Sequence, residues 1–392
     1  MKKLKTSCFL ACEFTCVLLS GSQALDTLPQ GPGIAWRFAK DSGITSDTAV
    51  VFADNFETYA QPSDLWKTYY NVFQQNQIRI VQETEHVYSG GKALEFTLPQ
   101  QSAELSNGVQ VSLAKQRDLL FLRYYSKFDT TFDITGSCHN GGGISAHYFN
   151  GYNSTPGVPA NGYNKFLVEF ECWRGDAQTA NPGQYNVYIY HPEQRTNYGD
   201  HFFPNGEVMP NTSLHFDFGP DFMSRPNVIP QLGRWYCHEV MLKANTIGMR
   251  DGRIACWLDG VLIADFPNLR FRDVDTIKID RFNVSFHAGS NTVRATRKWY
   301  DNIVAATSYI GPLNPGTQNT IRQKPGINSI SQNSGQRFTG ATVYNIAGRR
   351  ICRFGERAVR WNRETVPMGI YIVRSTAGDI KTELFQNNQI GF

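Results

Sequence analysis

The chain has 392 residues, of which 41% are hydrophobic and 13% aromatic, a size and composition that suit one large domain and a smaller one. The formal net charge is +4 and no block of Lys and Arg is present, which excludes nucleic acid as an expected partner. Abundant aromatic and glycine residues, with few helical stripes, favour β-structure.

The first 24 residues have the three parts of a secretory signal peptide. Lysines at positions 2, 3 and 5 precede a mainly apolar run over residues 9–19, and Ser22-Gln23-Ala24 offers a small-residue cleavage site. We therefore expect residues 1–24 to be removed and the protein to be secreted or displayed at the cell surface. Residues 25–49 predict an irregular lead-in, and no other segment is long and apolar enough to span a membrane.

Residues 50–311 are predicted to form one all-β domain. Short runs rich in Val, Ile, Phe, Tyr and Trp, each bounded by Gly, Pro, Asn or Asp, predict strands. The predicted strands cover residues 78–82, 92–97, 108–113, 119–127, 165–173, 185–190, 234–243, 252–258, 280–286 and 297–306. The dipeptide Asp259-Gly260 predicts a tight hairpin, and the pattern as a whole indicates a β-sandwich or jelly roll.

Two long segments, residues 137–164 and 191–231, interrupt the predicted strands. The first is rich in Gly and Asn, and the second in Pro, His and aromatic residues. Loops of this length in a compact domain are usually functional or disordered, and their aromatic residues argue against disorder. We expect the functional cleft to lie between them.

Five cysteines lie outside the predicted signal peptide: Cys138, Cys172, Cys237, Cys256 and Cys352. An odd number leaves at least one unpaired, and the lack of CxxC spacing argues against a cysteine zinc site. Cys237 and Cys256 lie in runs that could be neighbouring strands. A bridge between them is one alternative, and buried free thiols are the other.

Residues 312–336, rich in Pro, Gly, Asn, Gln and Ser, predict a linker to a small C-terminal β-sandwich module at 337–392. The module has a strand with a Gly-Arg turn at 341–350 and the run Pro-x-Gly-Ile-Tyr-Ile-Val at 367–373. This pattern resembles the C-terminal sorting domains of secreted enzymes of Gram-negative bacteria. The resemblance implies a bacterium of that type as the source and outer-membrane secretion machinery as a partner.

Four motifs follow one another in the main domain. They are Asp54-Asn55-Phe56-Glu57, Gly233-Arg234-Trp235-Tyr236, Trp257-Leu258-Asp259-Gly260 and Trp299-Tyr300-Asp301-Asn302-Ile303-Val304. This series resembles the concanavalin-A-like lectin and glucanase superfamily, and within it is most similar to the alginate-lyase-like polysaccharide lyases of family 14. The resemblance implies a jelly-roll sandwich that acts on a polysaccharide.

The same resemblance implies catalytic residues. In that family a Gly-Gly-Lys stretch, an Arg on the next strand and a Tyr-x-Tyr pair on the following strand form the site. Arg174, Tyr188 and Tyr190 match this pattern, while Gly143 stands where the lysine would be and His147 is the nearest substitute. Elimination from a uronate needs a cation to neutralise the carboxylate, a base and an acid, and Arg, Tyr and His side chains can fill these roles.

Strand alternation bears on these assignments. Tyr188 and Tyr190 share one face of their predicted strand and the apolar side chains share the other, so the tyrosines are predicted to face the cleft. The same rule places Arg174 inward, on the Phe170 face of the preceding strand, unless a bulge intervenes.

A rival pair of acids lies on that preceding strand. Glu169 and Glu171 share one face with Trp173, and paired carboxylates are what a retaining glycoside hydrolase needs. If the protein is instead a lyase or a binding module, these three residues bind the sugar, together with His139 and His191 beside the long loops.

Three functions therefore stay open: a lyase that cleaves a uronic-acid-containing glycan, a non-catalytic glycan-binding module, and a glycoside hydrolase that uses the two glutamates. None of them requires a cofactor. The resemblance also implies that Asp54, Glu57 and Asp301 could hold a structural Ca²⁺ between the first and last strands. An unmetallated pairing of these strands is the alternative.

Overall fold

The computed structural model describes residues 28–149 and 154–314, and beyond them only the backbone of six strands between residues 337 and 385. The predicted signal peptide, most of the predicted linker and the side chain of Cys352 lie outside the described residues. Within the described part, no helix has the length and apolar character needed to cross a membrane.

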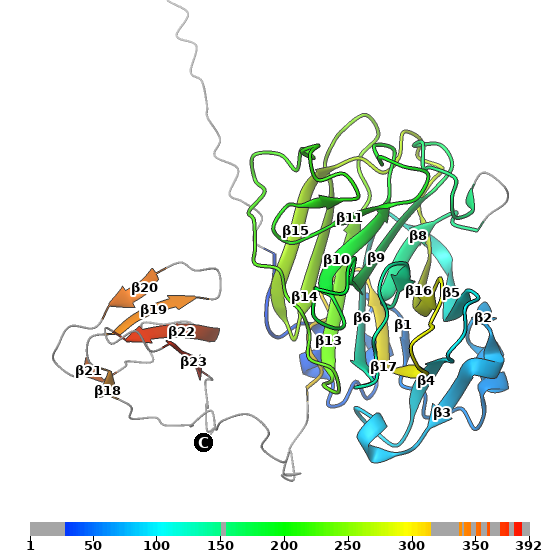
Figure 1. Cartoon of the computed structure of the whole chain (residues 1–392), viewed down its shortest axis with the longest axis horizontal. Helices are drawn as coiled ribbons and strands as arrows, with labels where there is room; N and C mark the ends of the chain where they lie inside the picture. Colours follow the sequence, from blue (N-terminus) through cyan, green and yellow to red (C-terminus); the bar gives the residue numbers. More distant parts are fainter. Residues whose placement is uncertain are drawn as a thin grey trace, which may run out of the picture.

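Two antiparallel sheets pack against each other, and Figure 1 shows them as two layers of a sandwich. Among the described residues, the first sheet has eight strands in the order β15-β14-β13-β6-β17-β4-β3, with β1 paired to β17. Their bounds are β1 Val50–Asp54, β3 Ile78–Val81, β4 Ala93–Leu98, β6 Leu119–Phe128, β13 Tyr236–Lys243, β14 Gly252–Leu258, β15 Val261–Leu269 and β17 Thr296–Ala306.

The second sheet has nine strands in the described part, in the order β12-β11-β10-β9-β8-β16-β5-β2, with β7 paired to β16. Their bounds are β2 Asn71–Phe73, β5 Leu105–Arg117, β7 Cys138–His139, β8 Gly142–Ala146, β9 Phe166–Trp173, β10 Gln184–Tyr190, β11 Asp200–Phe202, β12 Val208–Met209 and β16 Ile279–Ala288. The predicted all-β jelly-roll sandwich is confirmed, and each predicted strand coincides with a strand of one of the two sheets.

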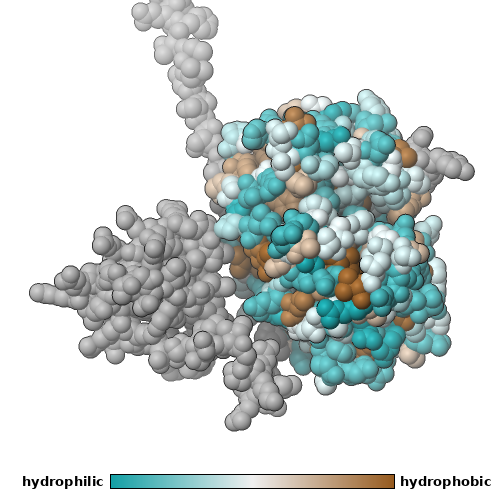
Figure 2. All heavy atoms as spheres, in the orientation of Figure 1, coloured by the Kyte–Doolittle hydropathy of each residue, from teal (hydrophilic) through white to brown (hydrophobic). Residues whose placement is uncertain are grey.

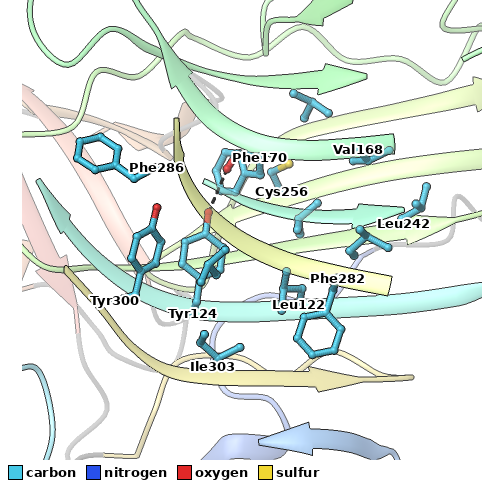
Figure 3. Packing of buried hydrophobic residues seen from close by; sticks show 14 of the residues in the cluster. Leu122, Tyr124, Val168, Phe170, Leu242, Cys256, Phe282, Phe286, Tyr300 and Ile303 are labelled. Carbon is cyan, nitrogen blue, oxygen red and sulfur yellow. Dashed lines mark hydrogen bonds between the residues drawn. The ribbon is translucent and has the colours of Figure 1, made fainter. Parts of the chain in front are cut away.

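Every second side chain of a strand fills the space between the sheets. On β9 these are Phe166, Val168, Phe170 and Cys172, each at most 1% exposed. Tyr124 on β6 crosses the core and donates its hydroxyl proton to the Phe170 carbonyl oxygen at 3.0 Å (Figure 3). Because side chains alternate along a strand, the residues between these four must point to the outer face of the second sheet.

The outer surface is polar by contrast. Figure 2 shows hydrophilic side chains over most of the visible face of the sandwich, with hydrophobic ones in small groups. A two-layer sandwich has this distribution because its hydrophobic side chains are concentrated between the two sheets.

Short strands lie inside both segments that the sequence predicted as long loops: β7 and β8 in the first, β11 and β12 in the second. β8 pairs with β9 on one side and β16 on the other. Its glycines hide it from pattern analysis because glycine has a low strand propensity. Packing nevertheless demands them, since a Cβ on Gly142 would lie 2.3 Å from the Tyr124 ring.

The predicted lead-in packs on the sandwich from residue 28 onward. It contains two 3-10 helices, Ile34–Arg37 and Ile44–Ser46, and Asp41 between them pairs with Arg123 of β6 at 2.5 Å. Arg123 is fully buried, and a buried charge needs a partner. Further 3-10 helices of the described part are Pro62–Lys67, Gln75–Gln77 and Thr84–His86.

Cys138, Cys172, Cys237 and Cys256 are buried free thiols. Strands β13 and β14 are neighbours, as a bridge would require, but Cys256 lies opposite Val240 and not opposite Cys237. The bridge is therefore wrong, and the alternative of free thiols is confirmed for these four residues.

The described strands of the C-terminal part form two sheets. One has the order β20-β19-β22-β23 and the other pairs β18 with β21. Their bounds are β18 Arg337–Phe338, β19 Ala341–Asn345, β20 Arg350–Arg353, β21 Val359–Arg360, β22 Gly369–Ser375 and β23 Ile380–Phe385. These strands agree with a β module, and its role in sorting stays a prediction.

The Asp41–Arg123 pair gives a stability prediction. Asp41→Ala leaves the Arg123 charge buried without a partner, so we expect the free energy of unfolding to fall by about 3–5 kcal/mol. Lys67→Ala is the control, because Lys67 is exposed and pairs with Asp64 at the surface, where a salt bridge contributes at most about 1 kcal/mol. Chemical denaturation followed by tryptophan fluorescence measures both, and equal losses would contradict the account.

Candidate active site

Polar side chains gather on the outer face of the second sheet. On β16 this face carries Arg281, Asn283, Ser285 and His287, all partly exposed, because the alternate residues of the strand fill the core. We define the histidine–glutamate cluster as the six titratable side chains that meet on this face, namely His139, Glu169, Glu171, Tyr188, His201 and His287.

The pair formed by His139 and Glu171 organises the cluster. His139 Nδ1 lies 3.0 Å from Glu171 Oε2, and Glu171 is only 1% exposed. Burial raises the pKa of Glu171 above its ordinary value, against the opposing charge of His139. Burial alone would lower the pKa of His139, but the Glu171 charge and hydrogen bond outweigh it and raise that pKa. The imidazolium is therefore favoured beside the carboxylate.

Tyr188 contacts two imidazoles. Its ring centroid lies 4.4 Å from that of His139 and 4.9 Å from that of His201, and its hydroxyl oxygen accepts the Gly199 N–H at 3.0 Å. Burial raises the pKa of Tyr188. Burial, together with the charge of His139, lowers the pKa of His201 to about 3, so His201 is neutral at physiological pH.

Aromatic side chains form the open rim of the cluster. The side chain of His139 is 24% exposed and that of His287 18%, and Trp173 is partly exposed and stacks on His201 at 4.7 Å. The two glutamates lie deeper. The open rim of the cluster therefore consists of imidazole and indole rings, and an indole is an amphipathic surface on which a ligand can stack.

Glu169 is fixed by a residue that the sequence analysis missed. Ser285 on β16 donates its hydroxyl proton to Glu169 Oε1 at 2.5 Å, and His287, two residues on, stacks on His139 at 5.4 Å. The signal was present in the sequence, because strict alternation of polar and apolar residues over 281–288 marks one face of β16 as outward.

Tyr190 shares the outer face with Tyr188 but is fully buried. Its hydroxyl oxygen accepts the Gly157 N–H at 3.2 Å, and Lys165 Nζ lies 4.2 Å from its ring centroid. Lys165 also donates to the Thr155 carbonyl oxygen at 2.5 Å, and burial lowers its pKa to about 8. These contacts hold the segment around Thr155 and Gly157 on the sheet. Tyr190 is thereby buried, and its ring centroid lies 5.7 Å from that of Tyr188.

Gly143 occupies the position where the family resemblance would place a lysine. It lies on β8 opposite Glu169 of β9 and Asn283 of β16. A Cβ on Gly143 would lie 2.7 Å from Asn283 Oδ1. A longer side chain would fit there only if Asn283 moved.

Three further predicted site residues, Arg174, His191 and His147, make their contacts away from the cluster. β9 ends at Trp173, so the alternation of that strand does not determine where Arg174 lies. Arg174 pairs with Asp133 at 2.5 Å, and it takes neither the inward position that alternation predicted nor the catalytic position that the resemblance implied. His191 is buried against Asp200 at 3.1 Å. His147 follows β8, and its N–H donates to the Asp280 carboxylate at 3.2 Å.

The carboxylates of the proposed calcium site already have protein donors. Asp54 accepts the hydroxyl protons of two tyrosines, and Glu57 and Asp301 each accept two backbone N–H groups of residues 88–92. A Ca²⁺ ion would displace these donors, and the site stays a prediction. Within the described residues, the group that could hold a metal is instead His139, Glu169 and Glu171, whose ligand atoms all lie within 4.8 Å of one another.

The placement of Arg174 yields a second prediction. Arg174→Ala removes its bonds to Asp133 and to the Thr179 carbonyl oxygen, so we expect unfolding to become easier by about 1.5–3 kcal/mol. Any activity that the cluster supports should stay unchanged, because the guanidinium is not part of the cluster. Thermal denaturation and an activity assay check the two statements, and lost activity in a folded variant would return Arg174 to the site.

No family model and no curated protein matches the chain. Among solved structures it is similar to alginate lyase Aly36B, at 22% identity and a TM-score of 0.47, over 65% of this chain and 96% of that one. It is also similar to an endo-β-1,4-glucuronan lyase from the fungus Trichoderma reesei, at 17% identity and a TM-score of 0.40, over 66% of this chain and 96% of that one. A marine PL-14 alginate lyase from Aplysia kurodai has 13% identity and a TM-score of 0.46, over 66% and 99%. At identities and TM-scores this low, the activity has to be inferred from the site itself.

Proposed function

We propose that this protein is a polysaccharide lyase that cleaves a uronic-acid-containing glycan by β-elimination at the histidine–glutamate cluster. One observation carries the proposal. Tyr188 on β10 and His287 on β16, strands that flank β9 and β8, both contact the His139 ring at the open rim, at 4.4 and 5.4 Å. Groups that can accept and donate protons therefore meet where a glycan can enter.

The chemistry of elimination suits such an arrangement. A base removes the C5 proton of the uronate, the C4–O bond breaks, and an acid protonates the leaving oxygen. The electron pair of the C5–H bond becomes the C4–C5 double bond, so no water is consumed. We assign His287 as the base and the Tyr188 hydroxyl as the acid, because they approach the rim from two sides. Solvent returns the proton from His287 to Tyr188 after product release.

Elimination also needs a positive charge that neutralises the uronate carboxylate. The two cations that the family resemblance implies are missing from the cluster, since Gly143 stands for one and Arg174 is bound to Asp133. The positive charge must come from within the cluster, beside Glu169 and Glu171.

A glycoside hydrolase is the second candidate, because Glu169 and Glu171 lie on one face of β9. A retaining hydrolase needs one carboxylate as a nucleophile that reaches the sugar. Here the carboxylates are already engaged, Glu169 by the Ser285 hydroxyl and Glu171 by the His139 ring, which favours elimination. A module that only binds glycans would need no proton-transferring groups at all.

The proposal includes an extracellular location. A polymeric substrate is met outside the cell, which agrees with the predicted signal peptide and with the sorting-type module. Deleting residues 337–392 should then alter secretion or attachment.

The central test of function is a pair of tyrosine variants on a panel of uronate-containing and neutral polysaccharides. Tyr188→Phe deletes the transferable proton, so we expect turnover to fall by about 10²–10⁴-fold with glycan binding preserved. Tyr163→Phe is the control, because Tyr163 is 64% exposed and lies outside the cluster. Ultraviolet absorbance of the unsaturated product reports turnover. Full activity in Tyr188→Phe would refute the assigned role, and new reducing ends without unsaturation would establish the hydrolase.

A further inference from the structure

We infer that His139, Glu169 and Glu171 bind a divalent first-row metal ion, Zn²⁺ or Mn²⁺, at the base of the histidine–glutamate cluster. The role given to the ion below rests on the proposed function, whereas its binding does not.

The geometry of the three side chains is the first argument. His139 is on β7, and Glu169 and Glu171 are on β9, all in the second sheet. Each side chain offers a ligand atom within 4.8 Å of the other two. His139 Nδ1 and Glu171 Oε2 are in direct contact at 3.0 Å. Metal ligands must be deprotonated, so an ion would replace the proton that this imidazole and carboxylate share.

An unpartnered buried atom is the second and independent argument. Glu171 Oε1 is buried and accepts no hydrogen bond in the described structure, although an unsatisfied buried carboxylate oxygen is costly. The ring atom His201 Nδ1 is 3.8 Å from it and bonds to Asn186 Oδ1 at 2.9 Å. A cation between the three ligands would satisfy this oxygen.

The surroundings of the ligands also fit a metal. Ser285 fixes Glu169 through its hydroxyl at 2.5 Å, and Glu169 and Glu171 sit on a strand that is paired on both sides. Hydrogen-bonded neighbours of this kind orient ligands in metal sites. His139 is the ligand that reaches solvent, so the open coordination positions would face the rim.

The ligand set selects the class of ion. One imidazole nitrogen with two carboxylate oxygens suits Zn²⁺ or Mn²⁺, whereas Ca²⁺ takes six to eight oxygen ligands and no imidazole. Three protein ligands with open positions are the arrangement of catalytic rather than structural zinc sites.

The ion would supply the positive charge that elimination needs, in place of the His139 imidazolium, which is already paired with Glu171. A divalent cation held by two glutamates and a histidine presents a positive charge to the uronate carboxylate. It would thus take the place of the lysine that Gly143 replaces and of Arg174, which binds Asp133.

Calorimetric titration of the chelator-treated, untagged protein with Zn²⁺, Mn²⁺ and Ca²⁺ tests the inference. We expect one equivalent of Zn²⁺ or Mn²⁺ to bind, at least about tenfold more weakly in Glu171→Gln. Glu193→Gln is the matched control, because Glu193 pairs with Arg250 away from the cluster, and its binding should equal that of the wild type. If Glu171→Gln does not fold, His139→Asn at the rim tests the same point.

Absence of binding, equal binding by Glu171→Gln, or a preference for Ca²⁺ would each overturn the inference. The inferred metal site and the proposed lyase activity can each be refuted without refuting the other. Unsaturated product formed equally with and without chelator would remove the catalytic role of the ion and leave the lyase. Stoichiometric metal binding without unsaturated product from any uronate glycan would keep the site and remove the lyase.

Discussion

Two glutamates withdrawn from water on one strand are the constraint on which the site depends. Glu169 and Glu171 alternate on β9 with apolar core residues such as Phe170, and a one-residue slip would carry both carboxylates into the inter-sheet core. Their burial demands partners. Ser285 on β16 binds Glu169, and His139 on β7 binds Glu171. The two buried carboxylates therefore depend on the positions of β16 and β7 beside β9.

The first sheet supports this arrangement from beneath. The Tyr124 hydroxyl bonds the Phe170 carbonyl oxygen on β9, and the Tyr300 hydroxyl bonds the Ser285 carbonyl oxygen on β16, at 3.0 and 2.5 Å. Lys298 donates to the Asn140 carbonyl oxygen from within the core, where burial lowers its pKa to about 8. The strands that carry the acids are thereby held by polar bonds as well as by apolar packing.

Alternation allowed much of the fold to be predicted from sequence, including the ten strands and the outward faces of β9 and β10. Alternation failed where close packing, and not strand propensity, selects the residue. β8 is rich in glycine because of contacts such as that between Gly142 and the Tyr124 ring. No local sequence pattern reveals such a contact. Part of the site was predictable for the same reason. Glu169, Glu171, Tyr188 and Trp173 were placed on the correct face. The burial of Tyr190 and the position of Arg174 outside the cluster depend on contacts with loop residues such as Gly157 and Asp133. The periodicity of a strand does not predict contacts of this kind.

The proposed elimination would cleave the glycan without water. Mass spectrometry of the oligosaccharides released from a uronate-containing polysaccharide tests it directly. Elimination predicts that each fragment with a newly formed non-reducing end is lighter by one water than the corresponding hydrolysis product, because that end carries the C4–C5 double bond. Fragments at the full hydrolytic mass would contradict the account and assign the chemistry to Glu169 and Glu171 as hydrolytic acids.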